Sequence, residues 1–108
     1  MDNPDHCLIV YGTLVPGGLY HYLLADLPGT WEECVITGRM GEYWGFRAFQ
    51  YDAAGAEHPA WLLTSPALPQ AFPELDLFEG EPYRRVVIPA QVGARRVLAH
   101  IYEGKEMD

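Results

Sequence analysis

Residues 75–85 read LDLFEGEPYRR, and they mark the change from a helix to the strands that end this chain of 108 residues. Apolar residues recur at a helical spacing after Ser65-Pro66, a pair that is typical of a helix start, and the pattern continues through Phe78. Pro69 and Pro73 lack the amide N–H that a helix interior needs, so we expect them to split the helix into short pieces. Gly80 suits the left-handed conformation in which many helices end.

The segment that follows predicts a β-hairpin. Residues 85–92 and 95–102 are rich in Val and Ile, and Gly93-Ala94 between them suits a two-residue turn. Pro89 cannot donate a hydrogen bond to a ladder, which argues against a central place for the first of these strands.

Further strands are predicted before this hairpin. Residues 7–11 form an apolar run without alternation, which indicates a strand covered on both faces. A short helix is expected over residues 19–27. The strands follow one another without regular crossover helices, so we expect an α+β fold built on an antiparallel sheet or small barrel. The length fits one domain that spans residues 1–108. The other predicted strands are residues 34–40, with a bulge at Gly38, 46–51 and 60–64.

The composition argues against several function classes. Apolar residues make up 49% of the chain, enough for a core, and charged residues make up 20%, too few for a disordered tail. The formal net charge of −8 argues against nonspecific nucleic-acid binding, which needs a basic face. No stretch approaches the length of a transmembrane helix. Membrane and nucleic-acid partners are therefore not expected.

The N-terminal residues and the cysteines indicate a compartment. Asp2 and Asp5 stand where a signal peptide has a basic start, so the expected location is cytoplasmic. Cys7 and Cys34 lie in apolar stretches and are predicted to be buried free thiols. The four histidines show no metal-ligand spacing with each other or with the cysteines, so no metal site is predicted.

Glu79 is the first candidate for chemistry, because it lies four residues after Leu75 and continues the apolar face of the predicted helix. A carboxylate there is partly desolvated, which raises its pKa toward the range useful for proton transfer. A surface glutamate at a helix end is the alternative reading. Glu74 is interpreted as a helix-stabilising carboxylate, and Asp76 either shares that role or takes part in function. Tyr83 either presents its hydroxyl to the same pocket or is an ordinary strand aromatic.

The turn after the first predicted strand is the second candidate. It reads Tyr11-Gly12-Thr13-Leu14. Gly12 permits a ligand to approach the backbone closely, and the following N–H groups can converge on a carboxylate. A glycine after a buried strand more often makes only a turn, so this motif gains its value from its pairing with residues 75–85. Aromatic residues between 43 and 51 are predicted to pack on the sheet, with a pocket rim as the alternative: Tyr43, Trp44, Phe46, Phe49 and Tyr51.

These two motifs resemble those of the γ-glutamylcyclotransferase-like family, also called the AIG2-like family. The similarity is carried by YGTL at residues 11–14 and by the pattern LDxFEGxxYRR at residues 75–85. The resemblance implies a small mixed, mainly antiparallel β-barrel with short helices. Two features depart from the family pattern: the loop at residues 15–18 lacks a basic residue, and Trp61-Leu62 replaces a frequent glycine.

The resemblance also implies an activity, which is the release of 5-oxoproline and a free amine or amino acid from a γ-glutamyl compound. Glu79 matches the family's catalytic glutamate and would act as general base and then general acid, without a metal or other cofactor. The implied substrate-binding residues are Tyr11, Gly12, Thr13, Leu14, Tyr83 and Arg84. The alternative is a module on the same barrel that binds a small metabolite without turnover. Oligomeric state and the identity of the amine do not follow from the sequence.

Overall fold

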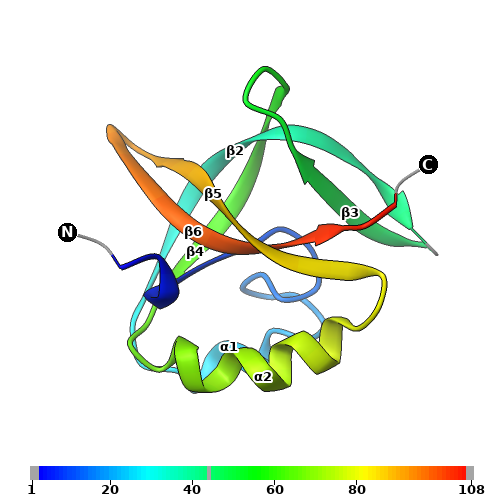
Figure 1. The fold of residues 1–108 in the computed structure, drawn as a ribbon. Helices are drawn as coiled ribbons and strands as arrows, with labels where there is room; N and C mark the ends of the chain where they lie inside the picture. The colour runs from blue at the N-terminus through cyan, green and yellow to red at the C-terminus, as the bar shows by residue number, and fades with distance from the viewer. Residues whose placement is uncertain (1–2, 44, 107–108) are drawn as a thin grey trace.

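The computed structural model describes residues 3–43 and 45–106, which form six strands, two α-helices and one short 3₁₀ helix (Figure 1). The strands are β1 (Cys7–Val10), β2 (Thr30–Tyr43), β3 (Phe46–Tyr51), β4 (Ala56–Thr64), β5 (Tyr83–Val92) and β6 (Arg95–Gly104). The helices are η1 (Pro4–His6), α1 (Tyr22–Ala25) and α2 (Leu68–Glu79).

Five of the strands close into a barrel. Neighbours pair in the order β2-β4-β1-β6-β5, and the pair Val35 and Gln91 joins β5 back to β2. The pairing of β1 with β6 is parallel and the other pairings are antiparallel. β3 lies outside this ring, and within the described residues it pairs with β2. The predicted α+β fold, a mixed and mainly antiparallel barrel with short helices, is confirmed.

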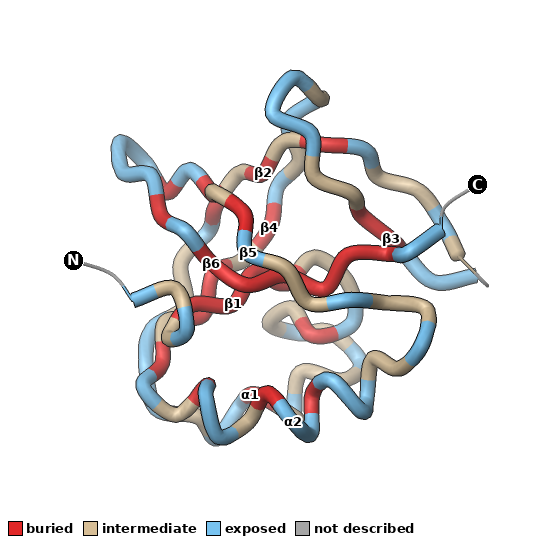
Figure 2. Tube along the Cα trace, viewed as in Figure 1, coloured by how far each residue is buried: buried red, intermediate tan, exposed pale blue. Residues whose placement is uncertain are grey.

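β1 separates two hydrophobic clusters, which is why its sequence shows no alternation. Cys7 and Ile9 pack in the cluster inside the barrel, whereas Leu8 and Val10 pack in the cluster beneath α2. All four residues are buried, as predicted for a strand covered on both faces. Figure 2 shows β1 and much of β6 as a continuous buried band between the barrel interior and the helical side. The loop that leaves β1 therefore starts from a rigid position.

α2 is one continuous helix, so the prediction that prolines would split it is wrong. Pro69 lies in the first turn, where an amide N–H has no helical partner to lose. Pro73 lies inside the helix and removes one backbone hydrogen bond, but Phe72 and Leu75 are buried on either side of it. Burial of these large side chains offsets the missing bond. The helix starts at Leu68, after a turn in which the Ser65 hydroxyl accepts from the Ala67 amide, not at Ser65 itself.

Other boundaries differ from the predictions at places where tertiary contacts decide them. The helix expected at residues 19–27 is reduced to α1, because the preceding residues are bound into a turn by the amide of Tyr20 and the carbonyl of Thr13. β2 is longer than predicted, since it pairs with β4 along its first part and with β3 along its second. Gly38 pairs in both ladders, and the predicted bulge is absent from them. Gly80 ends α2, as predicted, with a positive φ of 73° that glycine accommodates, but its ψ of −164° lies outside the left-handed helical conformation that was expected.

The hairpin of β5 and β6 has the predicted two-residue connection, with Val92 opposite Arg95 and a positive φ of 58° at Gly93. Pro89 pairs along β6, while the ladder between β5 and β2 comprises one described residue pair, Val35 with Gln91. Both cysteines are buried, as predicted, and no disulfide joins them. No helix among residues 3–43 and 45–106 is long and apolar enough to cross a membrane.

Candidate active site

The end of α2 and the loop after β1 meet in one cavity of about 440 Å³, which we call the loop cavity. Glu79, the last residue of α2, lines it together with the whole of the predicted motif at residues 11–14. Tyr83 lines the same cavity from the start of β5. Figure 1 shows that α2 and the loop after β1 lie on the same side of the barrel. Two segments that are far apart in the sequence therefore share one site.

The loop is held through its carbonyl groups. The carbonyls of Gly12 and Thr13 accept from the amides of Val15 and Tyr20, at 3.4 and 2.8 Å. The Leu14 carbonyl lies 3.0 Å from Nδ1 of His21, and the His21 ring packs against the indole of Trp31. Within the described part of the chain, no hydrogen bond from the amide N–H groups of residues 12–14 to another residue is found. The loop thus presents main-chain donors beside the cavity, which is what binding of an anion requires.

Burial changes the acidity of the groups around Glu79. Desolvation raises the pKa of its carboxyl from the ordinary 4.5 to about 7. Burial and then the negative charge of Glu79 raise the pKa of the Tyr83 hydroxyl. The pKa of Tyr11 is raised mainly by burial, with smaller contributions from Tyr83 and Glu79. A carboxyl with a pKa near neutrality can accept and return a proton, while both phenols stay protonated as donors.

The two phenols are tied to the surrounding backbone. The hydroxyl of Tyr11 donates to the carbonyl of Tyr102 at 2.6 Å, and that of Tyr83 donates to the carbonyl of Arg47 at 2.9 Å. These bonds connect the ends of β1 and β5 to β6 and β3, so they fix the walls of the loop cavity. Tyr102 itself lines the cavity.

Comparison with known proteins gives matches to solved structures only. No family model and no curated protein matches the sequence. YkqA from Bacillus subtilis matches with a TM-score of 0.76 at 20% identity, over 94% of this chain and 36% of YkqA. An uncharacterized protein from Pyrococcus horikoshii matches with a TM-score of 0.68 at 18% identity, over 93% of this chain and 78% of that protein. An AIG2-like protein from Mus musculus matches with a TM-score of 0.64 at 20% identity, over 93% of this chain and 77% of that protein. The chain has the AIG2-like fold.

The AIG2-like fold is the one that the two sequence motifs indicated. The TM-scores of 0.64–0.76 establish this fold although the identities are only 18–20%. The chain spans about a third of the length of YkqA.

Arg47 is a residue of the site that the sequence analysis missed. It lies near the start of β3 and lines the loop cavity, and its Nη1 lies 3.4 Å from the carbonyl of Tyr11. It is the one cationic side chain among the described residues that line this cavity. The aromatic residues around Arg47 allowed a pocket rim as an alternative, but no sequence signal singles out Arg47 itself, because its approach to the loop depends on how β3 pairs with β2.

Arg84, a predicted substrate contact, lies elsewhere. Its side chain is 61% exposed and its guanidinium lies 3.5 Å from Glu103. It is absent from the described residues that line the loop cavity, whereas its neighbour Tyr83 is among them. Adjacent residues on a strand point to opposite faces, which explains the difference. Arg84 is therefore left out of the proposed site.

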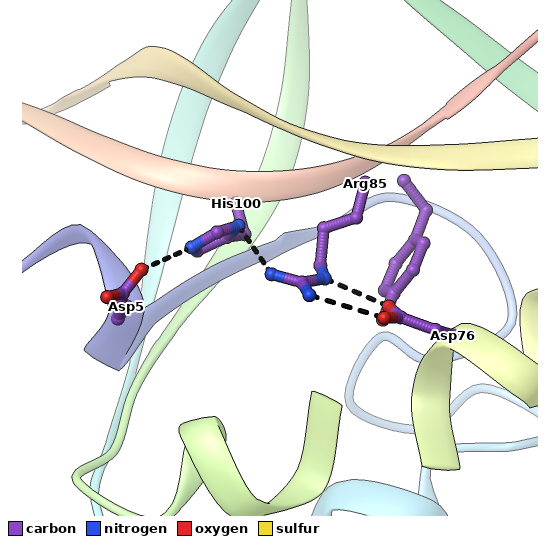
Figure 3. Close-up of polar contacts among 5 residues, drawn as sticks. Asp5, Asp76, Arg85 and His100 are labelled. Atoms are coloured by element: carbon purple, nitrogen blue, oxygen red, sulfur yellow. Dashed lines mark hydrogen bonds and ion pairs between the residues drawn. The ribbon is translucent and has the colours of Figure 1, made fainter. Parts of the chain in front are cut away.

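A polar network on the AIG2-like barrel anchors α2 next to Glu79. Figure 3 shows Arg85 hydrogen-bonded to Asp76 on one side and to His100 on the other, and His100 in turn hydrogen-bonded to Asp5. The Arg85 guanidinium makes two bonds to Asp76, at 2.9 and 3.2 Å. Arginine can only donate, so Nδ1 of His100 accepts from it and the imidazole proton lies on Nε2, which donates to Asp5.

The same network reaches the loop cavity. The hydroxyl of Tyr102, which lines the cavity, donates to Asp76 at 2.6 Å. The hydrogen bonds from Arg85 and Tyr102 hold the pKa of Asp76 below its ordinary value, so this carboxyl stays ionised at neutral pH. Asp76 lies one helical turn before Glu79 on α2. Of the two roles considered for Asp76, its contacts favour a structural one, in which it fixes the helix that carries Glu79.

Proposed function

We propose that this protein is a cytoplasmic γ-glutamyl cyclotransferase that uses Glu79 as its acid–base group. The observation that carries the proposal is the position of Glu79: a half-buried carboxyl with a pKa of about 7 lines the same cavity as the main-chain donors of residues 12–14. The AIG2-like fold and the two sequence motifs support the same function.

The proposed reaction is an intramolecular attack. The α-amine of the glutamyl group forms a C–N bond to the γ-carbonyl carbon, and the bond from that carbon to the departing nitrogen breaks. The products are 5-oxoproline and a free amine. Glu79 takes the proton that the attacking nitrogen loses and gives it to the departing nitrogen. The step balances without a co-reactant, and folding the substrate so that its two ends meet does much of the work.

The other groups of the loop cavity would hold the substrate. The guanidinium of Arg47 supplies the positive charge that the α-carboxylate needs, in a protein whose net charge of −8 repels anions at long range. The N–H groups of residues 12–14 can bind the same carboxylate or stabilise the oxygen that becomes negative during attack. The phenols of Tyr11 and Tyr83 close the cavity beside Glu79.

The test is a search for product. The purified protein is incubated with a panel of γ-glutamyl amines and γ-glutamyl amino acids, and 5-oxoproline is measured by mass spectrometry. The proposal expects 5-oxoproline from at least one compound, in a stoichiometry of one to one with the free amine. If no compound of the panel is converted but γ-glutamyl compounds bind measurably, the protein is the non-catalytic binding module and the cyclotransferase proposal is wrong.

A further inference from the structure

A second cavity of about 270 Å³ adjoins the loop cavity across Glu79, and we call it the aromatic compartment. The two cavities share four lining residues, which are Thr13, Phe46, Glu79 and Tyr83. Glu79 therefore stands at the boundary between them. A substrate whose scissile amide lies against Glu79 can extend one end into each cavity.

The aromatic compartment is lined mainly by aromatic rings. Besides Phe46 and Tyr83, these come from Tyr20, Tyr43 and Phe78. The rings of Tyr20 and Phe78 meet edge to face, with centroids 5.1 Å apart. Phe46 and Phe78 are 58% and 41% exposed although they are large and apolar. Exposed rings around a cavity are typical of a surface that a ligand covers.

The charges of the two cavities differ in a way that orients the substrate. The loop cavity contains Arg47, whereas Glu79 is the one charged side chain among the described residues that line the aromatic compartment. The glutamyl α-carboxylate belongs beside Arg47 and the loop donors. The departing group then lies among the rings. If that group carried its own carboxylate, the charge would be desolvated next to Glu79 without a cation to pair with.

We infer that the aromatic compartment selects the departing group, and that the preferred substrates are γ-glutamyl amides of amines with an aromatic or apolar body and no carboxylate. This inference rests on the proposed function and narrows it, because it separates γ-glutamyl amines from γ-glutamyl amino acids. Ring stacking favours the apolar body, and the absence of a cation disfavours the amino acid.

The test uses two substrates that differ in one group. γ-Glutamyl-phenethylamide and γ-glutamyl-phenylalanine have the same ring and differ by the carboxylate, while γ-glutamyl-ethylamide lacks the ring. We expect kcat/KM for the phenethylamide to exceed that of each of the others by about 10-fold or more. Phe78→Ala should lower the ratio of phenethylamide to ethylamide turnover. Leu77→Ala is the matched control, since Leu77 is 83% exposed and lies outside the described lining of both cavities.

The outcomes separate the two proposals. Equal turnover of the phenethylamide and the phenylalanine compound, or an unchanged ratio in Phe78→Ala, overturns the inference and leaves the cyclotransferase function standing. If none of the three compounds yields 5-oxoproline, binding of phenethylamine and of phenylalanine is measured by chemical-shift changes in NMR spectra. If phenethylamine binds, phenylalanine does not, and Phe78→Ala abolishes the binding of phenethylamine, the selectivity of the aromatic compartment is supported although the activity is absent. Equal binding of the two compounds, or binding of neither, overturns the inference.

Discussion

Replacing Glu79 by Gln tests the burial of this carboxyl independently of any substrate. The substitution keeps the shape of the side chain and removes its charge. In the wild type the folded state binds a proton at Glu79 more tightly than the unfolded state, because burial raises the pKa from 4.5 to about 7. Between these two values the folded state holds more protons, so the stability of the wild type falls as the pH rises.

The magnitude follows from the same two pKa values. A pKa near 7 in place of 4.5 corresponds to at most about 3 kcal/mol of folding free energy, which is present below pH 4.5 and lost above pH 7. The glutamine side chain of the variant does not titrate, so the variant keeps this stability. We expect wild type and Glu79→Gln to be similarly stable at pH 4, and the variant to be more stable by about 2–3 kcal/mol at pH 8.

The assay is equilibrium unfolding in urea at a series of pH values, followed by tryptophan fluorescence. Glu74→Gln provides the control, because Glu74 is exposed on the same helix and the substitution removes the same charge. A stability difference between wild type and Glu79→Gln that stays constant from pH 4 to pH 8 would refute the reasoning, since it would show that Glu79 titrates alike in the folded and unfolded chain.

Three further predictions follow from the contacts of the site and the barrel. Asp76→Asn should lower the free energy of unfolding by about 1 kcal/mol at pH 7, because it weakens the bond to Arg85. This loss should shrink as the pH falls below about 4, where the wild-type carboxylate becomes protonated; urea unfolding at a series of pH values measures it. Arg47→Gln should raise KM about 10-fold with a smaller change in kcat, measured by 5-oxoproline release, whereas Arg84→Gln should leave both unchanged. Gly29→Ala should lower stability by more than about 1 kcal/mol in thermal unfolding, because Gly29 has a φ of +143° and a Cβ there would overlap a backbone carbonyl of β4.

Local patterns in the sequence predict most strands, and long-range pairings decide the rest. The unbroken apolar run of β1 and the Gly-Ala turn of the last hairpin are local signals, and both predictions hold. The closure of the barrel depends on the pairing of Val35 with Gln91, and no local pattern in either segment predicts this pairing. The continuity of α2 through Pro73 was missed because the burial that compensates for the lost hydrogen bond is a tertiary effect.

The candidate site was predictable to a similar degree. The helical spacing from Leu75 to Glu79 indicates a carboxyl on an apolar face, and the structure places it in a cavity with residues 12–14. The aromatic residues divide between the two readings considered: Phe49 packs in the core, whereas Tyr43 and Phe46 line the aromatic compartment. Trp44 lies outside the described residues. Arg47 could not be foreseen, because its role depends on where the β3 strand lies relative to the loop after β1.

Proton transfer by Glu79 is the central claim, and the rate of 5-oxoproline release tests it most directly. Initial rates are measured for wild type, Glu79→Gln and the control Glu74→Gln with one γ-glutamyl substrate, from pH 5 to pH 9. We predict that kcat/KM of the wild type rises with a midpoint near pH 7, that Glu74→Gln behaves alike, and that Glu79→Gln loses at least about 100-fold in kcat. A Glu79→Gln protein that releases 5-oxoproline at the wild-type rate would contradict the account.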